Sequence, residues 1–172
     1  MTRFHAILAA AALTAAAALP VGAQPAQPLE TRLEARKVAT AADGRETLVP
    51  AESAKPGDVI EYAATYRNAG QRALTGLQAT MPIPANTEYL PGSARPATAK
   101  ASVDGRSFAD IPLKRKVRRD GREVEEPVPW REYRYLRWFP GELGGEKSVT
   151  YTARVRVADD RPAAEPPKGA AR

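Results

Sequence analysis

The chain has 172 residues, no cysteine, a single histidine, and a formal net charge of +6 at neutral pH. Without cysteine it can form neither disulfides nor thiolate metal sites. The histidine, His5, lies in an N-terminal segment that we expect to be removed. The mature protein would then lack imidazole as well, which excludes catalytic sites built on Ser–His or Cys–His pairs.

Residues 1–23 have the layout of a secretory signal peptide. Arg3 gives a basic start, a nearly uninterrupted apolar run follows over 6–19, and small residues precede Gln24. The apolar run is short for a membrane span of roughly 30 Å. We therefore expect cleavage between Ala23 and Gln24 and an extracytoplasmic protein, periplasmic or secreted. The alternative is an uncleaved N-terminal anchor.

The rest of the chain divides by composition into three parts. Residues 24–28 form a Pro/Gln/Ala linker, and residues 29–158 carry the periodic segments of one ordered domain. Residues 159–172 are a polar Pro/Ala-rich tail that cannot build a core and is expected to be disordered. The mature chain is long enough for one hydrophobic core of ordinary domain size.

The first segment of the domain is compatible with either a strand or a helix. Over 29–38, apolar and charged residues alternate, which favours a strand, although the same stretch could form a charged helix. Asp43-Gly44 predicts a turn. Residues 46–49 would then return beside the first strand.

Two clearer strands follow, joined by a turn at Asn68-Ala69-Gly70. The first spans 59–67 and the second ends at Pro82, because proline donates no ladder hydrogen bond. The residues expected on their inward faces are Ile60, Tyr62, Ala64, Tyr66, Leu77, Ala79 and Met81. Further on, Asp104-Gly105 predicts a tight hairpin over 102–108.

A charged hairpin is predicted over residues 115–126, with Asp120-Gly121 as a two-residue type I′ turn. This register pairs Arg118 with Glu123, Val117 with Val124, Lys116 with Glu125, and Arg115 with Glu126. A slip by one residue would lose every match. Most of the basic cluster is thus neutralised by its own return strand, which argues against a nucleic-acid partner.

The last part of the domain contains two more strands. Residues 133–139 are expected to form one, followed by a turn region from Pro140 to Gly145. Residues 148–157 form the most regular strand, with Tyr151 and Val155 on its inward face. Four aromatic residues are expected in the core: Tyr62, Tyr66, Trp138 and Tyr151.

Seven or more short strands separated by turns predict an all-β fold, an Ig-like antiparallel β-sandwich with an inserted charged β-hairpin. The turns and crossings also resemble a known family. The matching motifs are Pro56-Gly57-Asp58, Asn68-Ala69-Gly70, Met81-Pro82-Ile83-Pro84-Ala85-Asn86-Thr87-Glu88-Tyr89 and Pro91-Gly92-Ser93. They are similar to the conserved-repeat family called domain of unknown function 11, over roughly residues 29–157.

The resemblance implies an Ig-like module of bacterial envelope or cell-surface proteins, with no catalytic residues to carry over. Such domains commonly occur in tandem, whereas this chain holds a single copy. The resemblance therefore favours an accessory role over a long stalk.

Two non-enzymatic functions are consistent with the residues. The first is a structural or protein-interaction module whose partner is another envelope or surface protein. The second is binding of an anionic envelope polymer through the basic hairpin strand. The polymer would bind the cations Lys114, Arg115, Lys116, Arg118, Arg119 and Arg122. The possible interaction surface consists of Arg115, Lys116, Arg118, Arg119, Arg122 and Trp130.

The remaining alternatives concern Trp130 and the acidic residues. Trp130 is either an exposed contact residue or a packed residue that closes one end of the sandwich. The acidic residues lie at turns or opposite arginines, so neither a catalytic carboxylate pair nor a calcium site is expected. No cofactor, metal or catalytic residue is predicted.

Overall fold

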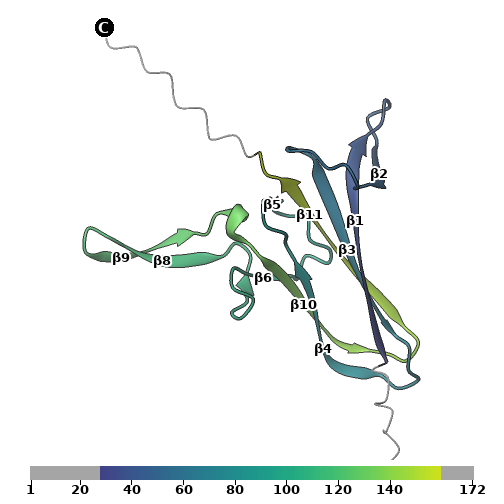
Figure 1. Ribbon diagram of the computed structural model, residues 1–172. Coiled ribbons are helices and arrows are strands. Elements are labelled where there is room, and N and C mark those ends of the chain that lie inside the picture. The colour runs from purple at the N-terminus through teal and green to yellow at the C-terminus, as the bar shows by residue number, and fades with distance from the viewer. Residues whose placement is uncertain (1–27, 160–172) are drawn as a thin grey trace, which may run out of the picture.

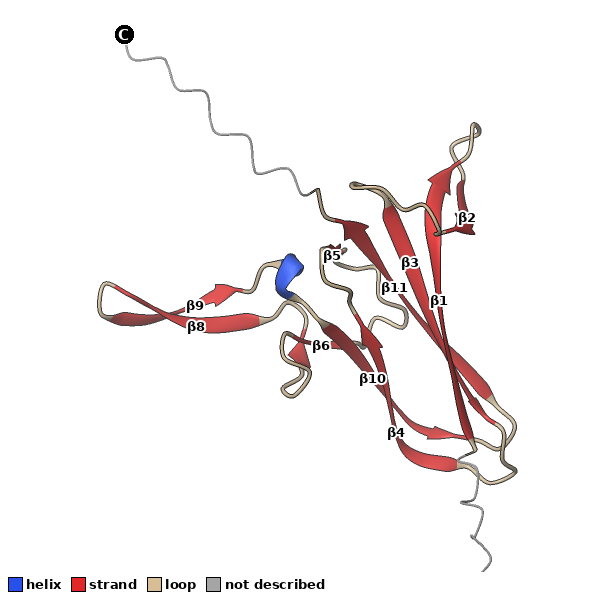
Figure 2. Cartoon of the chain, in the orientation of Figure 1, coloured by secondary structure: helices blue, strands red, loops and turns tan. Residues whose placement is uncertain are grey.

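The computed structural model describes residues 28–159, and these are nearly all β (Figures 1 and 2). The predicted signal peptide with its cleavage site, and nearly all of the predicted tail, lie outside the described residues. The elements are β1 (Leu29–Thr40), β2 (Glu46–Pro50), β3 (Val59–Asn68), β4 (Leu74–Pro82), β5 (Thr87–Tyr89), β6 (Lys100–Ser102), β7 (Ala109–Asp110), β8 (Lys114–Arg119), β9 (Arg122–Pro127), the 3₁₀ turn η1 (Trp130–Glu132), β10 (Tyr135–Leu143) and β11 (Ser148–Val157).

The strands form two packed sheets and a separate ribbon. One sheet has the order β2-β1-β3-β11-β5, the other has the order β4-β10-β6-β7, and β8 and β9 pair with each other. All recorded pairings are antiparallel. The predicted fold class, an all-β sandwich with an inserted hairpin, is confirmed.

The ambiguous segment at the start of the domain is a strand. Residues 29–38 pair with β3 along its whole length, and residues 36–40 pair with β2 across the turn at Asp43-Gly44. Gly44 has a φ of 81°, which suits the tight return. The alternation therefore identified the element correctly, and the helical alternative is wrong.

The core lies between the inward faces of the two sheets. The Trp138 ring on β10 stacks on Tyr151 of β11 with centroids 4.9 Å apart, and its indole N–H donates to the Pro96 carbonyl at 2.8 Å. Tyr66, Tyr151 and Trp138 are buried and Tyr62 is half-buried, as predicted. Two further core aromatics, Tyr89 and Tyr133, were not predicted: Tyr89 lies on the short strand β5, and Tyr133 precedes β10, which begins at Tyr135 and not at residue 133 as predicted.

Asn68 does more than form the predicted turn. It is fully buried, and its amide nitrogen donates to the carbonyls of Arg72, Leu143 and Gly144 at 2.8–3.1 Å. Its amide oxygen accepts the Gly70 N–H at 3.0 Å. One side chain thus joins the β3–β4 connection to the β10–β11 connection.

Two turn predictions are wrong. The loop between β6 and β7 is wider than a two-residue hairpin, since Ala101 pairs with Ala109 and the Asp104 side chain organises the residues between them. Pro140-Gly141 lies inside β10, where the register to β4 shifts on both sides of Gly141. A β-bulge tolerates a proline within a strand, so the chain reverses only after Leu143.

Candidate interaction surface

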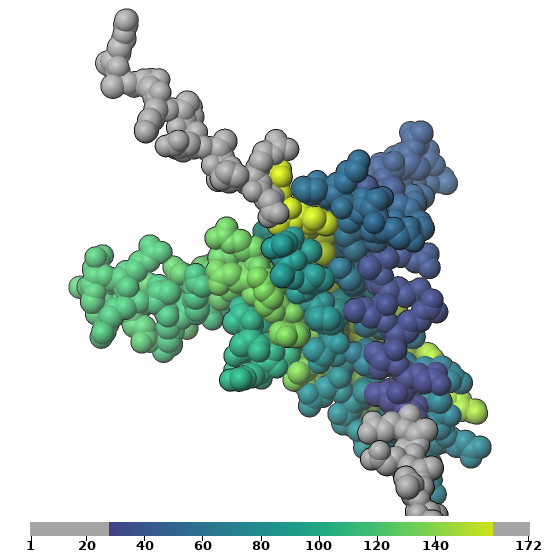
Figure 3. All heavy atoms as spheres, viewed as in Figure 1, coloured from purple at the N-terminus to yellow at the C-terminus, as the bar shows by residue number. Residues whose placement is uncertain are grey.

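The predicted hairpin forms an arm that stands clear of the sandwich. We call residues 114–127, which comprise β8, β9 and their turn, the arm. Figures 1 and 3 show it extending away from the two sheets, and among the described strands β8 and β9 pair only with each other. Both faces of the arm are therefore open to a partner.

The register of the arm is the predicted one. Val117 lies opposite Val124, and the three charged positions lie opposite glutamates as expected. Asp120 and Gly121 have φ values of 48° and 76°, as a type I′ turn requires. The matching of charges along the sequence therefore predicted the register of the arm at each of these positions.

The ion pairs of the arm follow the register only in part. The Glu126 carboxylate forms ion pairs with Arg115 at 3.2 Å and with Arg119 at 2.9 Å. Lys116 reaches diagonally to Glu123 at 2.7 Å instead of to Glu125. Hydrogen bonds from Arg115 and then Arg119 hold the pKa of Glu126 below its ordinary value, so this carboxylate stays charged.

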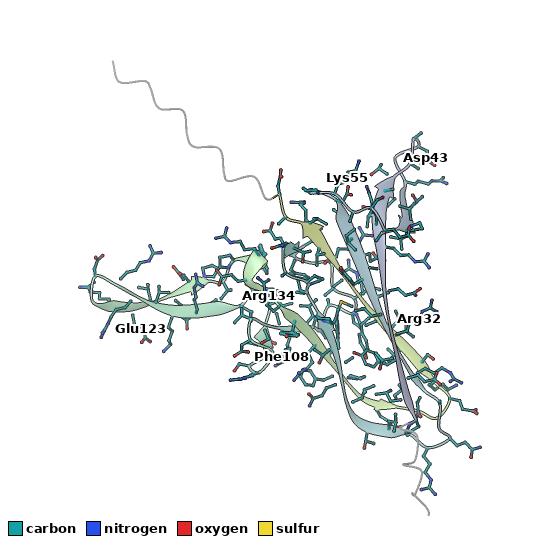
Figure 4. All side chains as sticks on the ribbon, viewed as in Figure 1. Arg32, Asp43, Lys55, Phe108, Glu123 and Arg134 are labelled. Carbon is teal, nitrogen blue, oxygen red and sulfur yellow. The ribbon has the colours of Figure 1, made fainter. Side chains whose placement is uncertain are left out.

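Two arginines of the arm have no carboxylate partner in the described part of the chain. Arg118 and Arg122 flank the turn, and neither makes an ion pair within residues 28–159. Of the predicted surface, Arg115, Lys116 and Arg119 are thus neutralised and Arg118 and Arg122 are not. Figure 4 shows charged side chains along both sides of the arm, with Glu123 labelled.

The base of the arm is fixed to the sandwich. Leu113 and Val128, which flank the arm, are buried, and the Val128 N–H donates to the Leu113 carbonyl at 2.9 Å. The Leu113 N–H in turn donates to the Tyr133 hydroxyl at 2.6 Å. Arg115 adds an ion pair to Glu132 at 2.8 Å. These contacts hold the direction of the arm relative to the core.

Trp130 belongs to this base. It is half-buried, and its ring lies 5.0 Å from that of Tyr133 and 5.9 Å from that of Tyr89. Of the two alternatives for Trp130, the packed one is correct: the residue closes the end of the sandwich. Sequence reasoning missed its partners because Tyr89 is distant along the chain.

A small cleft of about 230 Å³ lies beside the base. Val103, Leu113 and Val128 contribute apolar surface, while Arg115 and Glu132 contribute charge. The Asp104 carboxylate also lines it and accepts the N–H groups of Arg106 and Ser107. Bonds from Ser107, Arg106 and the Ser102 hydroxyl, in that order, lower the pKa of Asp104 to about 2.

Within the part of the chain that the structure describes, no three acidic or histidine side chains come together as metal ligands. No helix in the same part is long and apolar enough to span a membrane.

Comparison with known proteins adds no assignment. No family model, no curated protein and no solved structure matches the chain. The resemblance to the conserved-repeat family therefore stays a prediction.

Proposed function

We propose that the protein is a non-enzymatic interaction module that acts outside the cytoplasm in the bacterial envelope, periplasmic or released. Its partner is another envelope or surface protein, and the arm is its contact surface. The layout of residues 1–23 and the family resemblance support the location. The lack of cysteine and, after cleavage, of histidine supports a binding role over a hydrolytic one.

The observation that carries the proposal is the combination of projection and anchoring in the arm. Strands that serve only a core lie in its sheets, whereas the arm pairs with neither sheet and buries little of itself. At the same time, Leu113, Val128 and Tyr133 hold its base in one orientation. A surface that is exposed and oriented in advance loses less conformational entropy on binding.

Site-specific photocrosslinking in intact cells tests the proposal. A photoreactive residue replaces Val124 on the arm, which is 39% exposed, and in the matched control it replaces Leu48 on the first sheet, which is 43% exposed. We expect a discrete crosslinked species in the envelope fraction from position 124 and none from position 48. Equal crosslinking from both positions, or none from the arm, would contradict the proposal.

Intact-mass measurement tests the location separately. The extracytoplasmic form is expected to start at Gln24. A membrane-bound form that retains residues 1–23 would replace cleavage with anchoring.

One observation favours a second candidate function, binding of an anionic envelope polymer. Arg118 and Arg122 lack a carboxylate partner within residues 28–159, so a polyanion could bind them without displacing an internal ion pair. The test is binding to immobilised dextran sulfate over a range of salt concentrations. We expect weak binding, because only two arginines of the arm are free of carboxylates. Strong salt-sensitive binding that Arg118→Glu and Arg122→Glu abolish, while Arg32→Glu on β1 leaves it intact, would reverse this ranking.

A further inference from the structure

The outer strands of the two sheets are protected unequally. β5 and β7 have three and two residues, and β2 has five and ends in Pro50. β4 has nine residues, none of them charged, and among the described strands it pairs only with β10. Short length, charge, proline and bulges normally protect an exposed edge; β4 has its terminal Pro82, and the bulge at Gly141 lies on its partner β10.

The first sheet is also shifted sideways relative to the second, so that it extends past β4. The Tyr66 hydroxyl donates to the Thr80 carbonyl at 2.9 Å, which places β3 over β4. The stacking of Trp138 on Tyr151 places β11 over β10. Since β1 follows β3 on the side away from β11, it extends beyond the free edge of β4. No described strand of the second sheet lies opposite β1.

The uncovered face of β1 carries two apolar side chains, Leu33 and Ala35, between Thr31 and Lys37. Leu33 pairs with Ala64, a core residue, and so faces the same side, yet Leu33 is 46% exposed. Ala35 on the same face is exposed as well. An open concavity of about 490 Å³ is lined by Ala35, Pro50 and Ala51, together with Arg36 and Glu52. The concavity lies where β2 ends beside β1 and includes no β4 residue, so the exposed apolar side chains of β1 are what lies next to the free edge of β4.

We propose that an extended segment of a partner protein adds to β4 as one further strand, with its apolar side chains packed against Leu33 and Ala35. Backbone hydrogen bonds to β4 would supply affinity, and the apolar face of β1 would favour alternating apolar residues in the segment. The uncharged β4 favours a segment without charge on that stretch. This inference goes beyond the proposed role of the arm and does not depend on it.

A second copy joined edge to edge does not fit this position. Two β4 strands that pair across a two-fold axis lie about 4.8 Å apart. Each copy, however, extends β1 and β2 beyond its own β4, so the overhanging strands of the two copies would occupy the same space. The position therefore takes a single strand.

The remaining segments of this chain are also poor occupants. Residues 160–172 contain Pro162, Pro166 and Pro167, which donate no ladder bonds, and alanine is their only apolar residue type. Residues 24–27 reach at most about 14 Å, less than half the length of a nine-residue strand. Because residues 1–23 are expected to be removed as a signal peptide, we take a separate polypeptide as the occupant.

The test uses the mature chain and a synthetic nine-residue peptide of alternating valine and threonine. The peptide is N-methylated along one edge so that it cannot associate with itself. A control peptide is methylated along both edges and cannot pair with any strand. Binding is measured by fluorescence anisotropy, and amide hydrogen exchange locates the protected strand.

Two variants supply the matched comparison. Leu33→Glu places a charge on the proposed face, whereas Leu48→Glu places one on the outer face of the same sheet at similar exposure. We expect saturable binding of the first peptide only, with slowed exchange in residues 74–80. Leu33→Glu should weaken it about tenfold or more, because a charge would be buried against apolar side chains. Leu48→Glu should change it by no more than about twofold.

Several results would overturn the inference. Absence of saturable binding, equal loss in both variants, or protection at β5, β7 or the arm would each do so. A concentration-dependent dimer in sedimentation that Leu33→Glu abolishes would assign the face to a second copy instead.

Discussion

The arm and the sandwich hold their strands together in different ways. In the arm, carboxylates meet guanidinium and ammonium groups across β8 and β9, and Val117 opposite Val124 is the only apolar pair of side chains. In the sandwich, aromatic and aliphatic side chains fill the space between two sheets. Exposed ion pairs contribute about 0–1 kcal/mol each, whereas one buried large apolar side chain contributes several times more. The charges of the arm thus select a register, and the sandwich supplies the stability.

The substitution with the largest expected effect removes the central ring of the sandwich. Trp138→Ala should lower the free energy of unfolding by about 3–5 kcal/mol, because a cavity replaces a ring that is only 1% exposed. The control is Phe139→Ala, one residue further on, where the ring is 51% exposed and the expected change is within about 0.5 kcal/mol. Both are measured by denaturant unfolding. Similar losses from the two variants would place the core elsewhere.

A smaller effect is expected from the buried amide that joins two loops. Asn68→Ala should cost about 2–3 kcal/mol, since it leaves the Arg72, Leu143 and Gly144 carbonyls without this donor. Gln78→Ala, at an exposed amide on β4, is the control and should be nearly neutral. A loss for Asn68→Ala no greater than that of the control would show that water replaces the amide without cost.

A pH-dependent effect is expected from the loop beside the arm. The pKa of Asp104 falls from 3.8 to about 2 on folding, so its contribution is complete above the higher value and is lost as pH falls toward the lower one. Thermal unfolding is measured from pH 6 to pH 2. The unfolding temperature of the parent should exceed that of Asp104→Asn most near pH 6, and this difference should shrink between about pH 4 and pH 2. A difference that is constant across this range would mean that the charge of Asp104 is not involved. Asp43→Asn serves as the control, because the Asp43 carboxylate accepts only one backbone N–H, that of Arg45.

The sequence predicted local elements better than the contacts between them. Alternation placed β1, β3 and β11, and the charge match of Arg115 to Glu126 fixed the register of the arm, because both signals lie within one or two neighbouring strands. The prediction of a tight turn at Asp104-Gly105 was wrong. The dipeptide does not reveal that the Asp104 carboxylate accepts the backbone N–H groups two and three residues further on.

The candidate surface was predicted as a group, but its charge balance was not. Diagonal ion pairs decide which cations stay free, and they depend on side-chain reach and strand twist. The packing of Trp130 on Tyr89 could not be predicted either, because it joins two residues that are 41 positions apart in the sequence. The free edge of β4 depends on the order of strands in both sheets, which no local pattern contains.

The central claim, that the arm is an appended surface on a sandwich that folds without it, is tested most directly by its removal. Lys114 and Pro127 lie opposite each other in the register, so an Asn-Gly link can replace residues 115–126 and keep the buried Leu113 and Val128 in place. Denaturant unfolding of this variant should stay cooperative, with the free energy of unfolding within about 1 kcal/mol of the parent. Loss of the cooperative transition would contradict the claim and make the arm an integral part of the fold.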